Sequence, residues 1–314
     1  MKAGHIEQSA QVIPRSWAVR LLVVVALLLL QACASPADKL TVYASSQGFQ
    51  ERWFDTGEFK LLVFDNDKGH RRLSGKQEDT GVLHVYLEGD GSPWRHRVFI
   101  MADPTPRSPI MLRLMALDSA HAVYVGRPCY NGTSTAAPCD NSLWTSGRYS
   151  ERVVSNMSLA IRTLAKRRKA TEVWLFGHSG GGTLAMLLAA RLDKAMRVVT
   201  IAGNLDTDAW TEHHNYTRLF GSANPAQMPA LDEHIEQWHL LGEIDSVIPP
   251  MLVQQSIARQ PAARRFLLPG YGHGCCWERI WPTVLDALKK NDPAGIPGYL
   301  FSSGAISASG RDNR

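Results

Sequence analysis

The chain has 314 residues, of which 45% are hydrophobic and 20% are charged, with 25 glycines and 17 prolines. These proportions are ordinary for a folded globular protein and exclude intrinsic disorder, a collagen-like repeat and a multi-span membrane protein. The 34 basic and 29 acidic residues give a formal net charge of +5 without a basic stripe interleaved with aromatic residues, so we expect no nucleic-acid partner.

Residues 1–32 have the features of an export signal. Arg15 and Arg20 precede the apolar run 21–30, and a small residue, Ala32, follows it. The run has about ten residues, whereas a membrane-spanning helix needs about 20. We therefore expect a signal peptide over 1–32 and no permanent anchor made by this segment alone.

The sequence Leu-Gln-Ala-Cys at 30–33 resembles a bacterial lipobox, in which the cysteine becomes the new amino terminus and is acylated. This resemblance makes Cys33 the lipidation site and the membrane a partner through a lipid anchor. The alternative is a plain secretory signal that ends near Ala32 or Ala34. In lipoproteins of this kind, Ala34 in place of aspartate favours the outer membrane. We expect residues 33–48 to be a tether and the protein to face the periplasm, with secretion as the alternative.

Short apolar segments alternate with helical segments along residues 49–290, after an initial pair of strands. This pattern predicts a mostly parallel sheet of eight strands, joined by right-handed crossovers and flanked by helices. The expected strands are 50–55, 59–64, 82–87, 121–126, 172–176, 197–202, 237–241 and 264–268. The expected helices are 109–119, 148–169, 180–192, 250–259 and 277–290. The Gly-, Ser- and Pro-containing segment 291–314 reads as a flexible tail.

Export would place the four remaining cysteines in an oxidising compartment, where disulfides persist. Cys129 and Cys139 lie in one loop, so a local bond between them is the simplest pairing. Cys275 and Cys276 can bond to each other or each reach back to that loop. The spacing lacks a Cys-x-x-Cys pair with matching histidines, so we expect no metal and no other cofactor.

The run Gly177-His178-Ser179-Gly180-Gly181 follows an expected strand and opens an expected helix. A Gly-x-Ser-x-Gly elbow requires this context, because its glycines let the backbone turn sharply and expose the serine oxygen at the strand end. Ser179 is therefore a candidate nucleophile.

Over about residues 50–290 the chain resembles the α/β-hydrolase superfamily, and in particular poorly described bacterial lipoproteins within it. The resemblance implies a nucleophile, an acid and a histidine in that chain order, each after a strand. It assigns these roles to Ser179, Asp245 and His273. Asp245 can instead cap the next helix and His273 can be an ordinary loop residue, and Asp206 is the alternative acid.

A tetrahedral oxyanion needs preorganised N–H donors. The first expected donor is the backbone amide of Gly180. The second comes from Glu88-Gly89-Asp90-Gly91, which occupies the place of the His-Gly-x turn in the superfamily; the Asp90 amide is our choice and Gly91 the next. Glu88 departs from the pattern, in which histidine is frequent.

The segment 208–216 lies where this superfamily often has a cap over the pocket. Its residues Trp210, His213, His214 and Tyr216 can contact substrate or pack the cap, and we favour packing. Adjacent histidines diverge on a helix, which disfavours a metal site there.

These features predict an exported serine hydrolase that cleaves small-molecule carboxylic esters through a Ser-His-Asp triad and an acyl-enzyme. Two alternatives remain open: an amidase or peptidase that uses the same triad, and a non-catalytic envelope binding protein with this fold.

Overall fold

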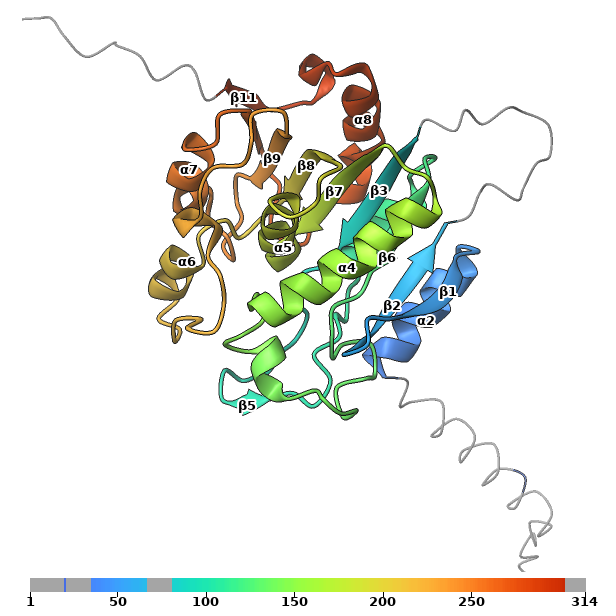
Figure 1. Cartoon of the computed structure of the whole chain (residues 1–314). Helices are drawn as coiled ribbons and strands as arrows, with labels where there is room; N and C mark the ends of the chain where they lie inside the picture. The colour runs from blue at the N-terminus through green and yellow to red at the C-terminus, as the bar shows by residue number, and fades with distance from the viewer. Residues whose placement is uncertain (1–19, 21–34, 67–80, 303–314) are drawn as a thin grey trace, which may run out of the picture.

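One sheet runs through the part of the chain described by the computed structural model, which comprises residues 20, 35–66 and 81–302 (Figure 1). The strands, in their order across the sheet, are β1 (Gln50–Asp55), β2 (Lys60–Asp65), β6 (Ala122–Val125), β3 (Val82–Leu87), β7 (Glu172–His178), β8 (Ala195–Ile201), β9 (Glu236–Gly242), β10 (Ala263–Leu268) and β11 (Tyr299–Ser302). The first eight in chain order, leaving aside a small separate hairpin, are those expected from the sequence. The strands from β6 to β10 are mutually parallel, and the pairs β1–β2, β2–β6 and β10–β11 are antiparallel.

Helices cover both faces of this sheet (Figure 1). They are α2 (Pro36–Ser46), α3 (Ile110–Ala116), α4 (Glu151–Arg167), α5 (Gly180–Ala189), α6 (Thr207–His213), α7 (Pro250–Ala258) and α8 (Trp277–Lys290). Because side chains alternate along a strand, β2 directs Leu61 and Val63 into the core under α4, α5 and α7. Its Leu62 and Phe64 enter the opposite core, under α2, α3 and α8.

Residues 36–46, which we expected to belong to a tether, form helix α2 instead. The Ser35 hydroxyl accepts a hydrogen bond from the Asp38 amide at 3.1 Å, and the Asp38 carboxylate accepts one from the Ser35 amide at 3.0 Å. This capping box starts the helix, and Leu40 and Ala44 then enter the core. Apolar burial therefore holds this segment on the domain.

The expectation of a flexible tail does not hold for the described part of residues 291–314. Ile296 is buried, and β11 adds a ninth strand by pairing with β10. Edge pairing depends on a free neighbouring strand, which the local sequence does not reveal. Residues 303–314 lie outside the described residues, as do the signal peptide, apart from Arg20, and Cys33. No helix in the described ranges is long and apolar enough to span a membrane.

Candidate active site

Ser179 occupies the sharp turn between β7 and α5, with φ 54° and ψ −122°. A non-glycine residue at this φ is strained, and such strain concentrates at functional sites. The turn is held by its backbone, since the Ser179 amide donates to the Ile201 carbonyl at 3.0 Å and the Ser179 carbonyl accepts from the Asn204 amide at 3.0 Å. The serine therefore has the geometry of a nucleophile elbow.

Two glycines of the motif are required by close backbone approach. A Cβ on Gly177 would lie 2.1 Å from the Gly181 carbonyl oxygen, and one on Gly181 would lie 2.1 Å from the Leu87 carbonyl oxygen. Neither position has room for a side chain. The motif thus packs the start of α5 directly against β7 and β3.

The structure brings Asp245 and His273 together from the loops after β9 and β10. Oδ2 of Asp245 lies 2.9 Å from Nδ1 of His273, and the Asp245 side chain is fully buried. Oδ1 of Asp245 accepts hydrogen bonds from the amides of Val247 and Ile248, both at 2.8 Å. The carboxylate is thereby fixed in place and holds the imidazole with Nε2 available for proton transfer.

His178, the residue before the nucleophile, links the elbow to the His273 loop. Its Nε2 donates to the His273 carbonyl oxygen at 2.8 Å, and the two rings lie 4.8 Å apart. Burial, together with the nearby His273, lowers the pKa of His178 to about 3, so this ring stays neutral. Within the described residues no hydrogen bond joins the Ser179 hydroxyl to the His273 ring. Such contacts often tighten only when substrate binds.

Asp206, the alternative acid, has a different partner set. Its Oδ1 accepts from the amides of Asp208 and Ala209 at the start of α6 and from the Asn224 side-chain amide at 3.0 Å. It caps a helix, whereas Asp245 contacts the histidine. The geometry therefore favours Asp245 as the acid.

The side chain of Asp90 lies against Gly180, whose amide is the first expected oxyanion donor. A Cβ on Gly180 would lie 1.9 Å from Oδ1 of Asp90 and 2.3 Å from the Tyr149 hydroxyl, so the Asp90 loop packs on the first turn of α5. The Gly180 amide is the first of that helix and has no carbonyl partner four residues earlier. The Gly180 amide is thus placed at the turn that carries Ser179, with the Asp90 side chain beside it.

A buried cluster of charges holds the Asp90 loop. The Asp90 carboxylate pairs with Arg127 at 2.9 Å and with Arg148 at 2.8 Å, and it accepts a hydrogen bond from the Tyr149 hydroxyl at 2.6 Å. Although burial alone would raise the pKa of Asp90, the two arginines hold it at about 2. Two guanidinium groups around one carboxylate leave the cluster with a net positive charge.

Glu88 lies at the end of β3, in the same loop. Burial raises its pKa to about 7, while its two carboxyl oxygens accept from the amides of Gly89 at 3.2 Å and Met111 at 3.0 Å. These bonds join the oxyanion loop to the start of α3. Glu88 thus anchors the loop at the position where histidine is frequent in the superfamily.

The expected cap forms around α6 and packs on the acid loop. Trp210 Nε1 and His214 Nε2 both donate to the Val247 carbonyl, at 3.0 and 2.8 Å, and Tyr216 stacks on His214. These contacts favour packing over substrate binding for the aromatic residues. In the described residues no three His, Cys, Asp or Glu side chains gather as a metal site.

The cysteines pair locally. Cys129 bonds to Cys139 and Cys275 bonds to Cys276. The second pair lies between His273 and α8, whose first residue Trp277 donates its indole N–H to the His273 carbonyl at 3.0 Å. A disulfide bond therefore restricts the backbone directly after the candidate base, His273.

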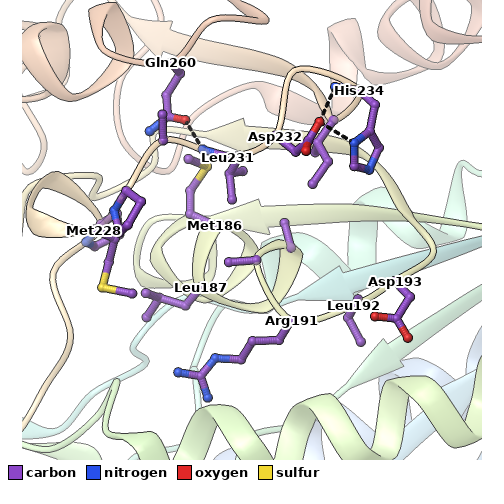
Figure 2. Close-up of a pocket in the computed structure, with 16 residues that line it drawn as sticks. Met186, Leu187, Arg191, Leu192, Asp193, Met228, Leu231, Asp232, His234 and Gln260 are labelled. Atoms are coloured by element: carbon purple, nitrogen blue, oxygen red, sulfur yellow. Dashed lines mark hydrogen bonds and ion pairs between the residues drawn. The ribbon is translucent and has the colours of Figure 1, made fainter.

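A separate cavity of about 550 Å³ lies at the other end of α5 and contains none of the candidate catalytic residues (Figure 2). Met186 and Leu187 of α5 face Met228 and Leu231 across it. The candidate active site is thus distinct from this cavity.

Arg127, Arg148 and Tyr149 are the residues of the site that sequence reasoning missed. They come from the loop after β6 and from the loop before α4, far along the chain from Asp90. Nothing in the sequence around Arg148 and Tyr149 predicts that they contact Asp90. The only local signal was the acidic residue itself within a glycine-rich turn.

Comparison with known proteins agrees with this fold. The family model for class 3 lipases matches residues 122–210, which include Ser179 but neither Asp245 nor His273. No curated protein matches the chain in sequence.

Solved structures with similar folds include hydrolases of several kinds. A proposed lipase of Acinetobacter baumannii is 13% identical with a TM-score of 0.55, covering 82% of this chain and 97% of its own. An esterase of Pyrococcus furiosus is 11% identical with a TM-score of 0.53, covering 79% of this chain and 94% of its own. Puromycin hydrolase is 15% identical with a TM-score of 0.54 over 81% of this chain, which spans only 41% of that protein's length.

At these identities the likeness shows a shared fold. The match to the class 3 lipase model over residues 122–210 agrees with a hydrolase of this fold. The chain has the fold of the α/β hydrolases.

Proposed function

We propose that the chain is a serine hydrolase that cleaves carboxylic esters with Ser179 as nucleophile, His273 as general base and Asp245 as its orienting acid. The observation that carries the proposal is the strained Ser179 turn, linked through His178 to a histidine that pairs with a buried aspartate. Strain at the serine and a fixed acid–base pair serve nucleophilic catalysis and have no evident structural purpose.

In the first half-reaction the Ser179 oxygen attacks the acyl carbon while Nε2 of His273 takes its proton. The oxyanion receives hydrogen bonds from the amides of Gly180 and Asp90, and the ion pairs of Asp90 with Arg127 and Arg148 hold the second of these donors in place. Collapse of the intermediate expels the alcohol, which takes the proton from His273. A water molecule then attacks the acyl-enzyme, gives its proton to His273 and releases the acid, and the proton returns to Ser179.

The test is labelling with a fluorophosphonate probe and hydrolysis of nitrophenyl esters and matching nitroanilides. We expect labelling and ester turnover in the parent chain and neither in Ser179→Ala. A parent that is never labelled would be a non-catalytic protein. Faster cleavage of the anilides would make it an amidase.

We further propose that the protein is exported and anchored through Cys33. Two disulfides in one domain fit an oxidising compartment, and the lipobox resemblance supplies the anchor. Cys33→Ser should leave the protein unprocessed or move it from the membrane pellet to the soluble fraction. Unchanged processing and sedimentation would refute lipidation at this residue.

A further inference from the structure

A small hairpin formed by β4 (Trp94–Arg95) and β5 (Phe99–Ile100) follows directly on the Asp90 loop and is exposed throughout. Val98 is 69% exposed and Phe99 65%, and the cross-strand pair Trp94 and Ile100 is 42% and 40% exposed. Large apolar side chains rarely gather on the surface of a soluble protein unless they contact something. We call residues 92–101 the β4–β5 hairpin.

Within the described residues, three cations that make no ion pair line a hollow at this hairpin. A cavity of about 520 Å³ is lined by Ser92, Trp94, Arg95, His96, Met101 and Arg107. No acidic residue lines it, and within the described ranges Arg95, His96 and Arg107 make no ion pair or side-chain hydrogen bond. Asp103, four residues before Arg107, accepts hydrogen bonds from Thr105. Two unpaired guanidinium groups in one hollow favour an anionic ligand.

The hairpin is held against the loop before α4 and against the cap. The Met101 amide donates to the Pro93 carbonyl at 2.9 Å, and the Trp144 indole donates to the Met101 carbonyl at 3.0 Å. At the hairpin's turn the Arg97 guanidinium lies 5.3 Å from the centre of the Tyr216 ring, which belongs to the cap. Trp94 is only four residues from Asp90, a span of at most about 14 Å.

The composition and size of the hairpin favour a membrane over a protein partner. A stable protein interface takes roughly 20–30 residues on each side, whereas the exposed hairpin offers seven, from Trp94 to Ile100. Insertion into a lipid headgroup layer needs only a few apolar side chains next to cations. Trp94, Val98 and Phe99 beside Arg95 and Arg97 meet that requirement.

We propose that the β4–β5 hairpin docks the protein on an anionic phospholipid surface, with a headgroup phosphate between Arg95 and Arg107 and with Val98 and Phe99 in the acyl boundary. This docking site goes beyond the proposed hydrolysis and does not require it.

The test uses the chain from Ser35 to Arg314, which contains every element from α2 to β11, with Ser179→Ala so that no lipid is hydrolysed. Its co-sedimentation is measured with vesicles of phosphatidylcholine alone and with vesicles that also contain phosphatidylglycerol. We expect clearly tighter binding to the anionic vesicles. R95Q/R107Q should weaken that binding about 30-fold, since each surface cation contributes about fivefold.

Two matched controls separate the hairpin from general surface effects. K166Q/K169Q removes the same charge where α4 leads into the amino end of β7, whereas the hairpin follows the carboxyl end of β3. This variant should change vesicle binding by less than about twofold. Val98→Ser should weaken binding to vesicles about tenfold, whereas Val42→Ser, at 68% exposure on α2, should not. Circular dichroism and thermal unfolding verify that each variant folds.

Three outcomes would overturn the proposal. The first is equal binding, or none, on the two kinds of vesicle. The second is a double arginine variant that binds as the parent does. The third is saturable binding of inorganic phosphate without binding to anionic vesicles, which would make the hollow a site for a free anion. None of these outcomes depends on whether Ser179 hydrolyses esters.

Discussion

Replacing Ser179 by glycine should abolish hydrolysis and at the same time stabilise the protein. The residue is held at φ 54° and ψ −122°, where a Cβ is strained and glycine is not. Ser179→Ala serves as the matched control, because alanine also lacks the hydroxyl but keeps the Cβ and the strain. Both variants lose the nucleophile, so the difference between their free energies of unfolding reports the backbone strain at residue 179.

The size of the effect follows from two opposed contributions. Relief of backbone strain of this kind is worth about 1–3 kcal/mol. Glycine costs about 0.5–1 kcal/mol because it gains more freedom in the unfolded chain. Ser179→Gly should therefore exceed Ser179→Ala in free energy of unfolding by about 1 kcal/mol. For a domain of this size, that difference corresponds to about 2–4 °C in melting temperature.

The assay is urea unfolding of both variants followed by tryptophan fluorescence and circular dichroism, with the same denaturant slope required of both. A glycine variant that is equally or less stable than the alanine variant would refute the inference that the elbow stores strain. If either variant hydrolysed esters at the parent rate, Ser179 would not be the nucleophile.

Asp245→Asn should lower kcat by about 10⁴-fold because the His273 tautomer is lost, whereas Asp206→Asn should leave kcat near the parent value and lower stability by at most about 1 kcal/mol as a helix cap. Burial lowers the pKa of His239 to about 3. The folded state therefore binds fewer protons than the unfolded state between pH 3 and 6.5, and stability falls as the pH falls through that window. His239→Gln should make the slope of unfolding free energy against pH shallower by about 1 kcal/mol per pH unit. Mild reduction of the bond between Cys275 and Cys276 should loosen the loop of the base and lower turnover by about tenfold or more.

Each of these results has a clear counterpart that would contradict it. A larger kcat loss in Asp206→Asn would transfer the role of the acid. An unchanged pH slope in His239→Gln, measured by urea titration at several pH values, would show that this histidine is not held neutral. Turnover that does not change when two thiols per chain are released beside His273 would show that the adjacent disulfide does not support the base.

Much of this protein could be predicted from the sequence because the relevant signals are local. Each expected strand and helix rests on the period of its own apolar residues, and their ends differ from the structure by a few residues. The elbow is equally local, since five consecutive residues carry the glycines that the turn needs around Ser179. The acid and the base, Asp245 and His273, followed from the resemblance to the α/β-hydrolase superfamily, which expects each of them in a loop after a strand of the parallel sheet.

Other features depend on which distant segments meet, and the sequence could not show them. The helix at 36–46 and strand β11 exist because the core and the edge of β10 are available to receive them. The arginines around Asp90 approach from two other loops, and within the described residues no acidic side chain lines the hollow that contains Arg95 and Arg107. Periodicity and motifs determine local conformation, whereas the pairing of charges depends on distances across the fold, which only the packed tertiary structure sets.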